Sequence, residues 1–262
     1  MIKGMAIAGR HLNSPEYIKS ATCALGFIRT NLWRDGRLLA TFNDGKARFG
    51  AYLDDYAFLL DAILELLQVR WRSSELSFGC DLADVLLAHF EDREHGGFYF
   101  TADDHEQLIQ RPKSLADEAT PSGNGIAAQA LARLGLLLGD VRYLDAAERT
   151  LNAAVKMINE APVAHASLLT ALEEKITPAH IVILRGAGRN FDEWHRLCIR
   201  DYAPQRLSFA TSDNARDLPN ALAEKVPQGE VVAYVCKGMN CSPPIDDLKS
   251  LQALLTETTV KV

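Results

Sequence analysis

The sequence contains no long hydrophobic run. Its most apolar stretch, residues 52–69, is interrupted by four acidic side chains, whereas a membrane-spanning helix needs about 20 consecutive apolar residues. The apolar opening of residues 1–8 contains Lys3 and is followed closely by Arg10, which does not fit a signal peptide with a cleavage site. We therefore expect a cytoplasmic protein with no membrane partner.

The sequence also has fewer basic than acidic residues. The chain has 28 Lys and Arg against 34 Asp and Glu, which gives a formal net charge of −6. Binding to nucleic acid depends on clustered basic side chains, so no nucleic-acid partner is expected. With 262 residues, 48% of them hydrophobic, the sequence is typical of a globular protein with one large domain, or a large and a small one.

Cysteine is sparse as well. The five cysteines include no CxxC pair and no spacing typical of a zinc site; they are Cys23, Cys80, Cys198, Cys236 and Cys241. We interpret them as reduced, structural thiols. The alternative is a redox role for Cys236 and Cys241, which are close in sequence but have no predicted helix N-terminus beside them to stabilise a thiolate. No metal ion or other cofactor is expected.

Helical periodicity dominates the first two thirds of the chain. Apolar residues recur at spacings of three and four and predict seven helices, over residues 1–8, 17–32, 52–69, 76–90, 126–138, 142–158 and 163–172. Two long connections, residues 33–50 and 91–121, alternate with short turns. Every second connection in a stack of antiparallel helices lies on the same side. Both long connections and the N-termini of the third and fifth helices should therefore share one face, with the even-numbered helices in the other layer.

The pattern changes after about residue 177. Strands are predicted over residues 180–184, 207–210 and 230–236, with helices over 190–201 and 246–255. We predict a mainly α fold, an incomplete toroid of antiparallel helical hairpins over residues 1–175, followed by a small α/β piece over residues 176–262. Gly186 and Gly188 follow the first strand, but Phe191 stands where a dinucleotide-binding loop has its third glycine, so no nucleotide cofactor is expected.

The first turn of the predicted helix 52–69 carries candidate site residues. Asp55 lies on the apolar side of this helix, with Tyr52 and Tyr56 beside it. A buried carboxylate needs a partner, so Asp55 is either a first-turn acid stabilised by the helix dipole or a group placed in a pocket. The acids Asp54, Asp61 and Glu65 share another face of the helix, where solvation is the simple expectation.

The second long connection carries further candidates. Residues 96–113 flank a polar tip and predict a β-hairpin that folds over the same face. His105, which lies among three acids in this tip, is a candidate for metal binding or proton transfer, or an ordinary turn residue. Arg111 follows the hairpin, and Ser122 and Asn124 lie in a glycine-rich segment that forms either a ligand surface or a closely packed helix start. We expect Tyr52, Asp55, His105, Arg111, Ser122 and Asn124 to surround a common depression.

Several of these segments resemble the YyaL-like family, the spermatogenesis-associated proteins with an N-terminal thioredoxin-like domain before an α/α toroid. The matching segments are residues 53–59, 96–106, 111–113, 121–124 and 233–236, together with Cys241. The resemblance implies an (α/α)6 toroid similar to N-acylglucosamine 2-epimerases and six-hairpin glycosidases. The thioredoxin-like domain and several toroid helices have no counterpart here, so we expect an open edge that favours homo-oligomers through exposed apolar surface.

The candidate site residues lead to two hypotheses about function. The leading hypothesis is a carbohydrate-active or carbohydrate-binding toroid, because aromatic faces with carboxylates and amides suit a sugar. In it, Asp55 and His105 are catalytic and Tyr52, Tyr56, Arg111, Ser122 and Asn124 bind substrate. The epimerase relatives use histidines on the toroid face, and none lies in the first turn of the third or fifth predicted helix, so epimerase activity is not predicted. The alternative is a non-catalytic interaction module for a protein partner or a thioredoxin-like domain.

Overall fold

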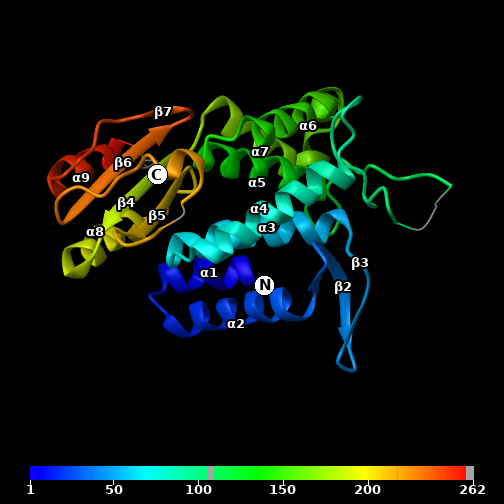
Figure 1. Cartoon of the computed structure of the whole chain (residues 1–262). Helices are drawn as coiled ribbons and strands as arrows, with labels where there is room; N and C mark the ends of the chain where they lie inside the picture. Colours follow the sequence, from blue (N-terminus) through cyan, green and yellow to red (C-terminus); the bar gives the residue numbers. More distant parts are fainter. Residues whose placement is uncertain (106–108, 217, 258–262) are drawn as a thin grey trace.

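The computed structural model describes residues 1–105, 109–216 and 218–257 (Figure 1). It confirms all seven predicted helices of the first two thirds, with ends shifted by a few residues. They are α1 (Ile2–His11), α2 (Pro15–Asn31), α3 (Leu53–Val69), α4 (Ser73–Val85), α5 (Gly123–Leu138), α6 (Val141–Glu160) and α7 (Ala166–Ile176). No described helix combines the length and apolar character needed to cross a membrane.

The helices form two layers. The odd-numbered helices pack side by side in the order α1, α3, α5, α7, while α2, α4 and α6 each pack against the odd-numbered helix that precedes them (Figure 1). Helix α3 is covered on several sides and is buried over most of its length, which explains its nearly continuous apolar sequence. The predicted class is confirmed: mainly α, built from antiparallel helical hairpins, with a small α/β portion.

Local signals explain the tight turn between α5 and α6. Gly139 ends α5 in the left-handed conformation, with φ 68°, which glycine adopts without a steric penalty. Asp140 then caps α6 by accepting a hydrogen bond from the backbone N–H of Arg142, 3.0 Å away. These two residues fix the reversal of chain direction that places α6 on the outer layer.

The first long connection is not a plain loop. It forms an antiparallel sheet of β1 (Trp33–Arg34), β2 (Arg37–Asn43) and β3 (Lys46–Gly50). Both turns are Asp-Gly pairs with positive φ at each residue, Asp35–Gly36 and Asp44–Gly45, a local signal typical of tight hairpins.

The second long connection has less regular structure than predicted. The hairpin predicted over residues 96–113 does not form in the described part of this segment, and its residues 106–108 lie outside the described residues. The chain is irregular there, apart from an isolated bridge between Glu91 and Phe98.

The predicted C-terminal strands and helices all form, and one short strand that was not predicted, β7 (Asn240–Cys241), adds to them. The strands β4 (His180–Gly186), β5 (Arg206–Ser212), β6 (Val231–Lys237) and β7 (Asn240–Cys241) form one sheet in the order β5-β4-β6-β7. Strands β4 and β5 are parallel and are joined by α8 (Gly188–Arg200), while β6 runs antiparallel to β4. One face of the sheet packs on the helical layer, and the other packs on α8 and α9 (Leu248–Glu257).

Two expectations about side chains are wrong. Cys236 and Cys241 form a disulfide rather than a pair of reduced thiols, while Cys23, Cys80 and Cys198 are free. Asp61 and Glu65 are 3% and 7% exposed rather than solvated. They face basic side chains of α1 and α5, because α3 lies between those two helices and has little solvent-exposed surface.

Candidate functional site

The two long connections and the N-termini of α3 and α5 do share one face, as predicted. The backbone N–H of Leu53, at the start of α3, donates to the carbonyl of Phe100 in the second connection, at 3.0 Å. The start of α5 lies directly against α3, since a Cβ at Gly123 would overlap the carboxylate of Asp54. We call this the loop-covered face.

A pocket of about 270 Å³ lies between these two helix N-termini. Its lining combines the aromatic residue Phe100 with acidic and hydroxyl-bearing residues, which are Asp54, Glu118, Ser114, Thr120 and Ser122. Burial raises the pKa of Asp54, and the neighbouring negative charge of Asp55 raises it further. A carboxyl group whose pKa is raised holds its proton more readily than an exposed aspartate, which suits a role in proton transfer.

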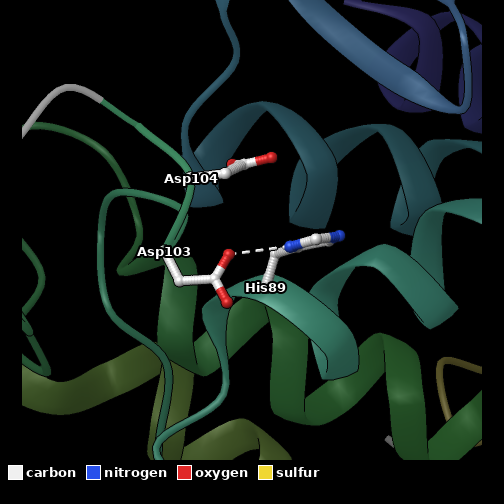
Figure 2. Close-up of side chains that lie close together, drawn as sticks. All are labelled: His89, Asp103 and Asp104. Carbon is white, nitrogen blue, oxygen red and sulfur yellow. Dashed lines mark hydrogen bonds and ion pairs between the residues drawn. The ribbon is translucent and has the colours of Figure 1, made fainter.

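A His–Asp pair lies on the same face. Helix α4 continues into a π-helical turn, Leu86–Phe90, that carries His89. The Nδ1 of His89 lies 2.7 Å from Oδ1 of Asp103, as Figure 2 shows. Burial alone would raise the pKa of Asp103, but the hydrogen bond and charge interaction with His89 outweigh it, and the pKa falls below its ordinary value. This arrangement orients the imidazole and leaves Nε2 without a hydrogen-bond partner among the described residues.

Asp104 lies close to His89 and Asp103, and the three residues together form a candidate metal site. Ligand atoms of His89, Asp103 and Asp104 all lie within 4.8 Å of one another. However, the guanidinium of Arg37 donates to both carboxylate oxygens of Asp104, at 2.6 and 2.7 Å, and a bidentate pair of this kind is strong. A cation would have to compete with Arg37 at the same oxygens, so the cluster fits hydrogen bonding and proton transfer better than metal binding.

An aromatic stack lies on the same face. Tyr52 stacks on Phe100 with ring centroids 4.8 Å apart and an interplanar angle of 11°, and the ring of His105 lies 5.5 Å from Tyr52. The Nδ1 of His105 is buried without a hydrogen-bond partner in the part of the chain that the structure describes. Two residues predicted for the site, Tyr52 and His105, are therefore brought together, and Phe100 links them to the pocket.

Asp55 does not line the 270 Å³ pocket. Its carboxylate accepts a hydrogen bond from the backbone N–H of Tyr52 at 2.9 Å, which closes a capping box at the start of α3. Burial raises its pKa, and this hydrogen bond opposes the increase. It lines a separate groove of about 540 Å³ between α1, α2, α3 and α5, with Met1, Ala24, Ile28, Phe58, Leu59 and Ile126. The donor to Asp55 is therefore the helix backbone, in agreement with the first-turn acid that was one of its two expected roles.

Three other predicted residues serve the scaffold. The hydroxyl of Tyr56, 1% exposed, accepts from the backbone N–H of Leu38 at 2.8 Å. The amide of Asn124, fully buried, accepts from Phe98 N at 2.6 Å and donates to the carbonyl of Phe98 at 3.0 Å. Arg111 lies over the ring of Tyr99 and donates to backbone carbonyls of the second connection, those of Thr101 and His89.

The expected common depression around all the predicted residues is therefore not found in the described structure. Of the predicted residues, only Ser122 lines the 270 Å³ pocket, and its hydroxyl also donates to the carbonyl of Ser114 at 3.2 Å. The physical reason is that the irregular connection of residues 91–121 has many backbone polar groups without strand partners. Buried groups of this kind require side-chain partners, and Asn124 and Arg111 provide them.

The sequence-based prediction missed three residues of the face: His89, Asp54 and Arg37. His89 was treated as part of an ordinary helix, although its position in the last turn before the long connection was visible in the sequence. Asp54 was assigned to the solvated side of α3 because the position of α5 was unknown. Nothing in the sequence indicated that Arg37 would lie beside Asp104.

Comparison with known proteins confirms the predicted resemblance. The chain is 27% identical to human spermatogenesis-associated protein 20 over 273 residues and 28% identical to the rat protein of the same name over 274 residues. Each alignment covers 97% of this chain and 35% of the relative. The chain thus spans about a third of the length of the curated relatives it matches. No family model matches the sequence.

Solved structures with a similar arrangement of helices include two carbohydrate enzymes. One is the unsaturated glucuronyl hydrolase of Bacillus sp. GL1, with a TM-score of 0.46 and 20% identity, covering 58% of this chain and 43% of that one. The other is cellobiose 2-epimerase of Bacillus thermoamylovorans, with a TM-score of 0.47 and 15% identity, covering 58% of this chain and 41% of that one.

Proposed function

We propose that the chain binds and acts on a carbohydrate at the loop-covered face, with the 270 Å³ pocket as the site for one sugar ring. The observation that carries the proposal is the composition of this pocket, whose lining includes both Phe100 and Asp54, a carboxyl whose pKa is raised. A sugar ring has apolar C–H faces and polar hydroxyl edges. An aromatic wall beside carboxylates and hydroxyls complements both.

Two groups on this face are suited to proton transfer. Asp54 offers a carboxyl that burial keeps closer to neutral than an exposed aspartate. His89 offers a ring nitrogen whose orientation is fixed by Asp103. A catalytic acid and base must both reach the substrate, so in this proposal the pocket holds one sugar unit and the next unit extends over Tyr52 toward His89.

The sharpest test compares Asp54→Asn with Asp55→Asn. Both changes remove one negative charge from the first turn of α3, but only Asp54 lines the pocket. Binding is measured by isothermal titration calorimetry and ligand-detected NMR against a panel of neutral sugars and uronic acids. We expect Asp54→Asn to lower affinity for the bound sugar by about tenfold or more, the loss of one charge-assisted hydrogen bond, and Asp55→Asn to leave it nearly unchanged.

Three outcomes would contradict the proposal. The first is a panel in which no sugar binds. The second is equal loss of binding in both variants, which would indicate damage to the N-terminus of α3 rather than to the pocket. The third is loss in Asp55→Asn alone, which would restore the sequence-based assignment of Asp55 and move the site to the 540 Å³ groove. Circular dichroism of each variant checks that α3 remains folded.

The 540 Å³ groove favours a second candidate function, a non-catalytic interaction module. Its wall is largely apolar and is built from four helices, a surface suited to an amphipathic helix of a partner. A separately expressed thioredoxin-like domain is the partner to test. In this alternative, Ile28→Asp abolishes a complex seen by size-exclusion chromatography, while Asp54→Asn has no effect on it.

A further inference from the structure

A disulfide lies at the edge of the C-terminal sheet, away from the loop-covered face. Cys236 on β6 and Cys241 on β7 are directly opposite each other in the hairpin register, with Cα atoms 3.9 Å apart. The side chain of Cys236 is buried, whereas Cys241 is exposed. We propose that this pair is a reversible thiol–disulfide exchange site for an external dithiol, in which Cys241 carries the sulfur that is attacked.

The hairpin does not depend on the sulfur bond for its shape. After Cys241 the chain stays on β6, because Ser242 N donates to the carbonyl of Val235 at 2.8 Å. Further on, Ala233 and Ile245 exchange two backbone hydrogen bonds of 2.8 and 2.9 Å. These bonds keep both cysteines in register when the disulfide is open. The bridge also spans only five positions of sequence, and a small closed loop constrains the unfolded chain little.

A reductant can reach the disulfide. Both cysteines line a pocket of about 490 Å³ between the hairpin, the end of α5 and the face of β4. The hairpin turn that borders the pocket, Gly238 and Met239, is formed with a positive φ of 58° at Gly238. Cys241 is exposed, whereas Cys236 is only 4% exposed, so an external thiolate approaches Cys241 more easily than Cys236.

The free cysteines differ from this pair. Burial raises the pKa of Cys198 to about 12. Burial, together with the nearby charge of Asp84, raises the pKa of Cys80 to about 11. Both therefore stay protonated near neutral pH and react slowly, since the thiolate is the reactive form. Cys23 is exposed but has no described cysteine beside it to form a disulfide with. Among the described cysteines, only Cys236 and Cys241 can complete a two-electron exchange.

The exchange balances as follows. A thiolate of the external dithiol attacks Sγ of Cys241, the Cys236–Cys241 bond breaks, and its electron pair leaves on Sγ of Cys236, which takes a proton from solvent. The second thiolate of the dithiol then attacks the mixed disulfide and releases Cys241 as a thiolate, which is also protonated. The protein gains two electrons and two protons, and the dithiol becomes a disulfide.

The test uses the full 262-residue chain with Cys23→Ser as background, dithiothreitol as the dithiol and no denaturant. Samples equilibrated in mixtures of reduced and oxidised dithiothreitol are alkylated with iodoacetamide and weighed by intact mass spectrometry, with peptide mapping. We expect a reversible gain of two alkyl groups, on Cys236 and Cys241, with the circular dichroism spectrum and the thermal midpoint essentially retained. Cys80 and Cys198 should stay unmodified.

Single variants test the assigned direction of attack. In the same background, Cys236→Ser leaves the exposed Cys241, and Cys241→Ser leaves the buried Cys236. Oxidised glutathione should form a mixed disulfide with the Cys236→Ser variant at least about tenfold faster than with the Cys241→Ser variant, because access controls the rate of exchange. The proposal is overturned if the bond opens only in denaturant, if its reduction unfolds the protein, if air does not re-form it, or if Cys236 is the faster of the two to react.

Discussion

Removing the guanidinium of Arg133 should strongly destabilise the helical layer. Arg133 on α5 is 7% exposed and forms a two-point ion pair with Glu174 of α7, through Nε at 2.9 Å and Nη2 at 2.6 Å. Its Nη1 lies 3.7 Å from a carboxylate oxygen of Asp61 and 3.6 Å from one of Glu65. Burial would lower the pKa of Arg133, but these carboxylates outweigh it and raise the pKa. The guanidinium is therefore fully charged when folded.

The charges in this cluster balance. Asp61 also pairs with Lys3 at 2.7 Å, and Arg10 lies 3.7 Å from Glu65, so three carboxylates face three cations. Arg133→Met keeps the helix propensity of the position but leaves two cations for three carboxylates, of which Asp61 and Glu65 are buried and Glu174 is nearly so. Breaking a buried pair by removing one partner costs about 3–5 kcal/mol, a large part of the roughly 5–15 kcal/mol that stabilises a typical domain.

Urea unfolding at neutral pH, followed by circular dichroism, measures this loss. Arg133→Lys keeps the charge but not the two-point geometry, so it should lose about half as much. The control is Lys175→Met, which breaks the exposed pair with Glu148 and should cost less than about 1 kcal/mol. Adding Glu174→Gln to Arg133→Met should recover about 1–3 kcal/mol relative to additivity. A loss below about 1 kcal/mol for Arg133→Met, or strictly additive double-variant energies, would refute the electrostatic argument.

Three other predictions concern separate parts of the fold. Asn124→Ala leaves both backbone groups of Phe98 unpaired and should cost about 3 kcal/mol in urea unfolding; a neutral Asn124→Ala would contradict the bridging role. Burial lowers the pKa of His195 below 6.5, although the hydrogen bond to the backbone of Gln68 opposes this shift. As the pH drops below about 6.5, the unfolded state therefore takes up the proton before the folded state does, and stability falls by at most about 1.4 kcal/mol per pH unit. His195→Gln should flatten this slope in thermal unfolding. The apolar 540 Å³ groove should favour homo-oligomers, which light scattering will detect and Phe58→Asp should disrupt; a monomer at high concentration would refute this.

The sequence determined the helices and the change to α/β structure, because hydrophobic periodicity and turn residues are local signals. All seven helices, and the order of strands and helices after residue 177, follow from them. The Asp-Gly turns at residues 35–36 and 44–45 were local as well, so the small sheet could have been predicted from the same kind of evidence. The shared face of α3 and α5 followed from loop lengths alone.

The tertiary structure decided which side chains face the pocket and which support the backbone. Asp54 and Asp55 are neighbours with the same chemistry. The cap that Asp55 forms with Tyr52 is local, whereas only the position of α5 places Asp54 in the pocket. His89 and Asp103 are 14 positions apart, and Asn124 and Phe98 are 26 apart. Such pairs depend on how an irregular connection folds back on the helices. That path is set by satisfying buried backbone groups over the whole face, which no local pattern in the sequence records.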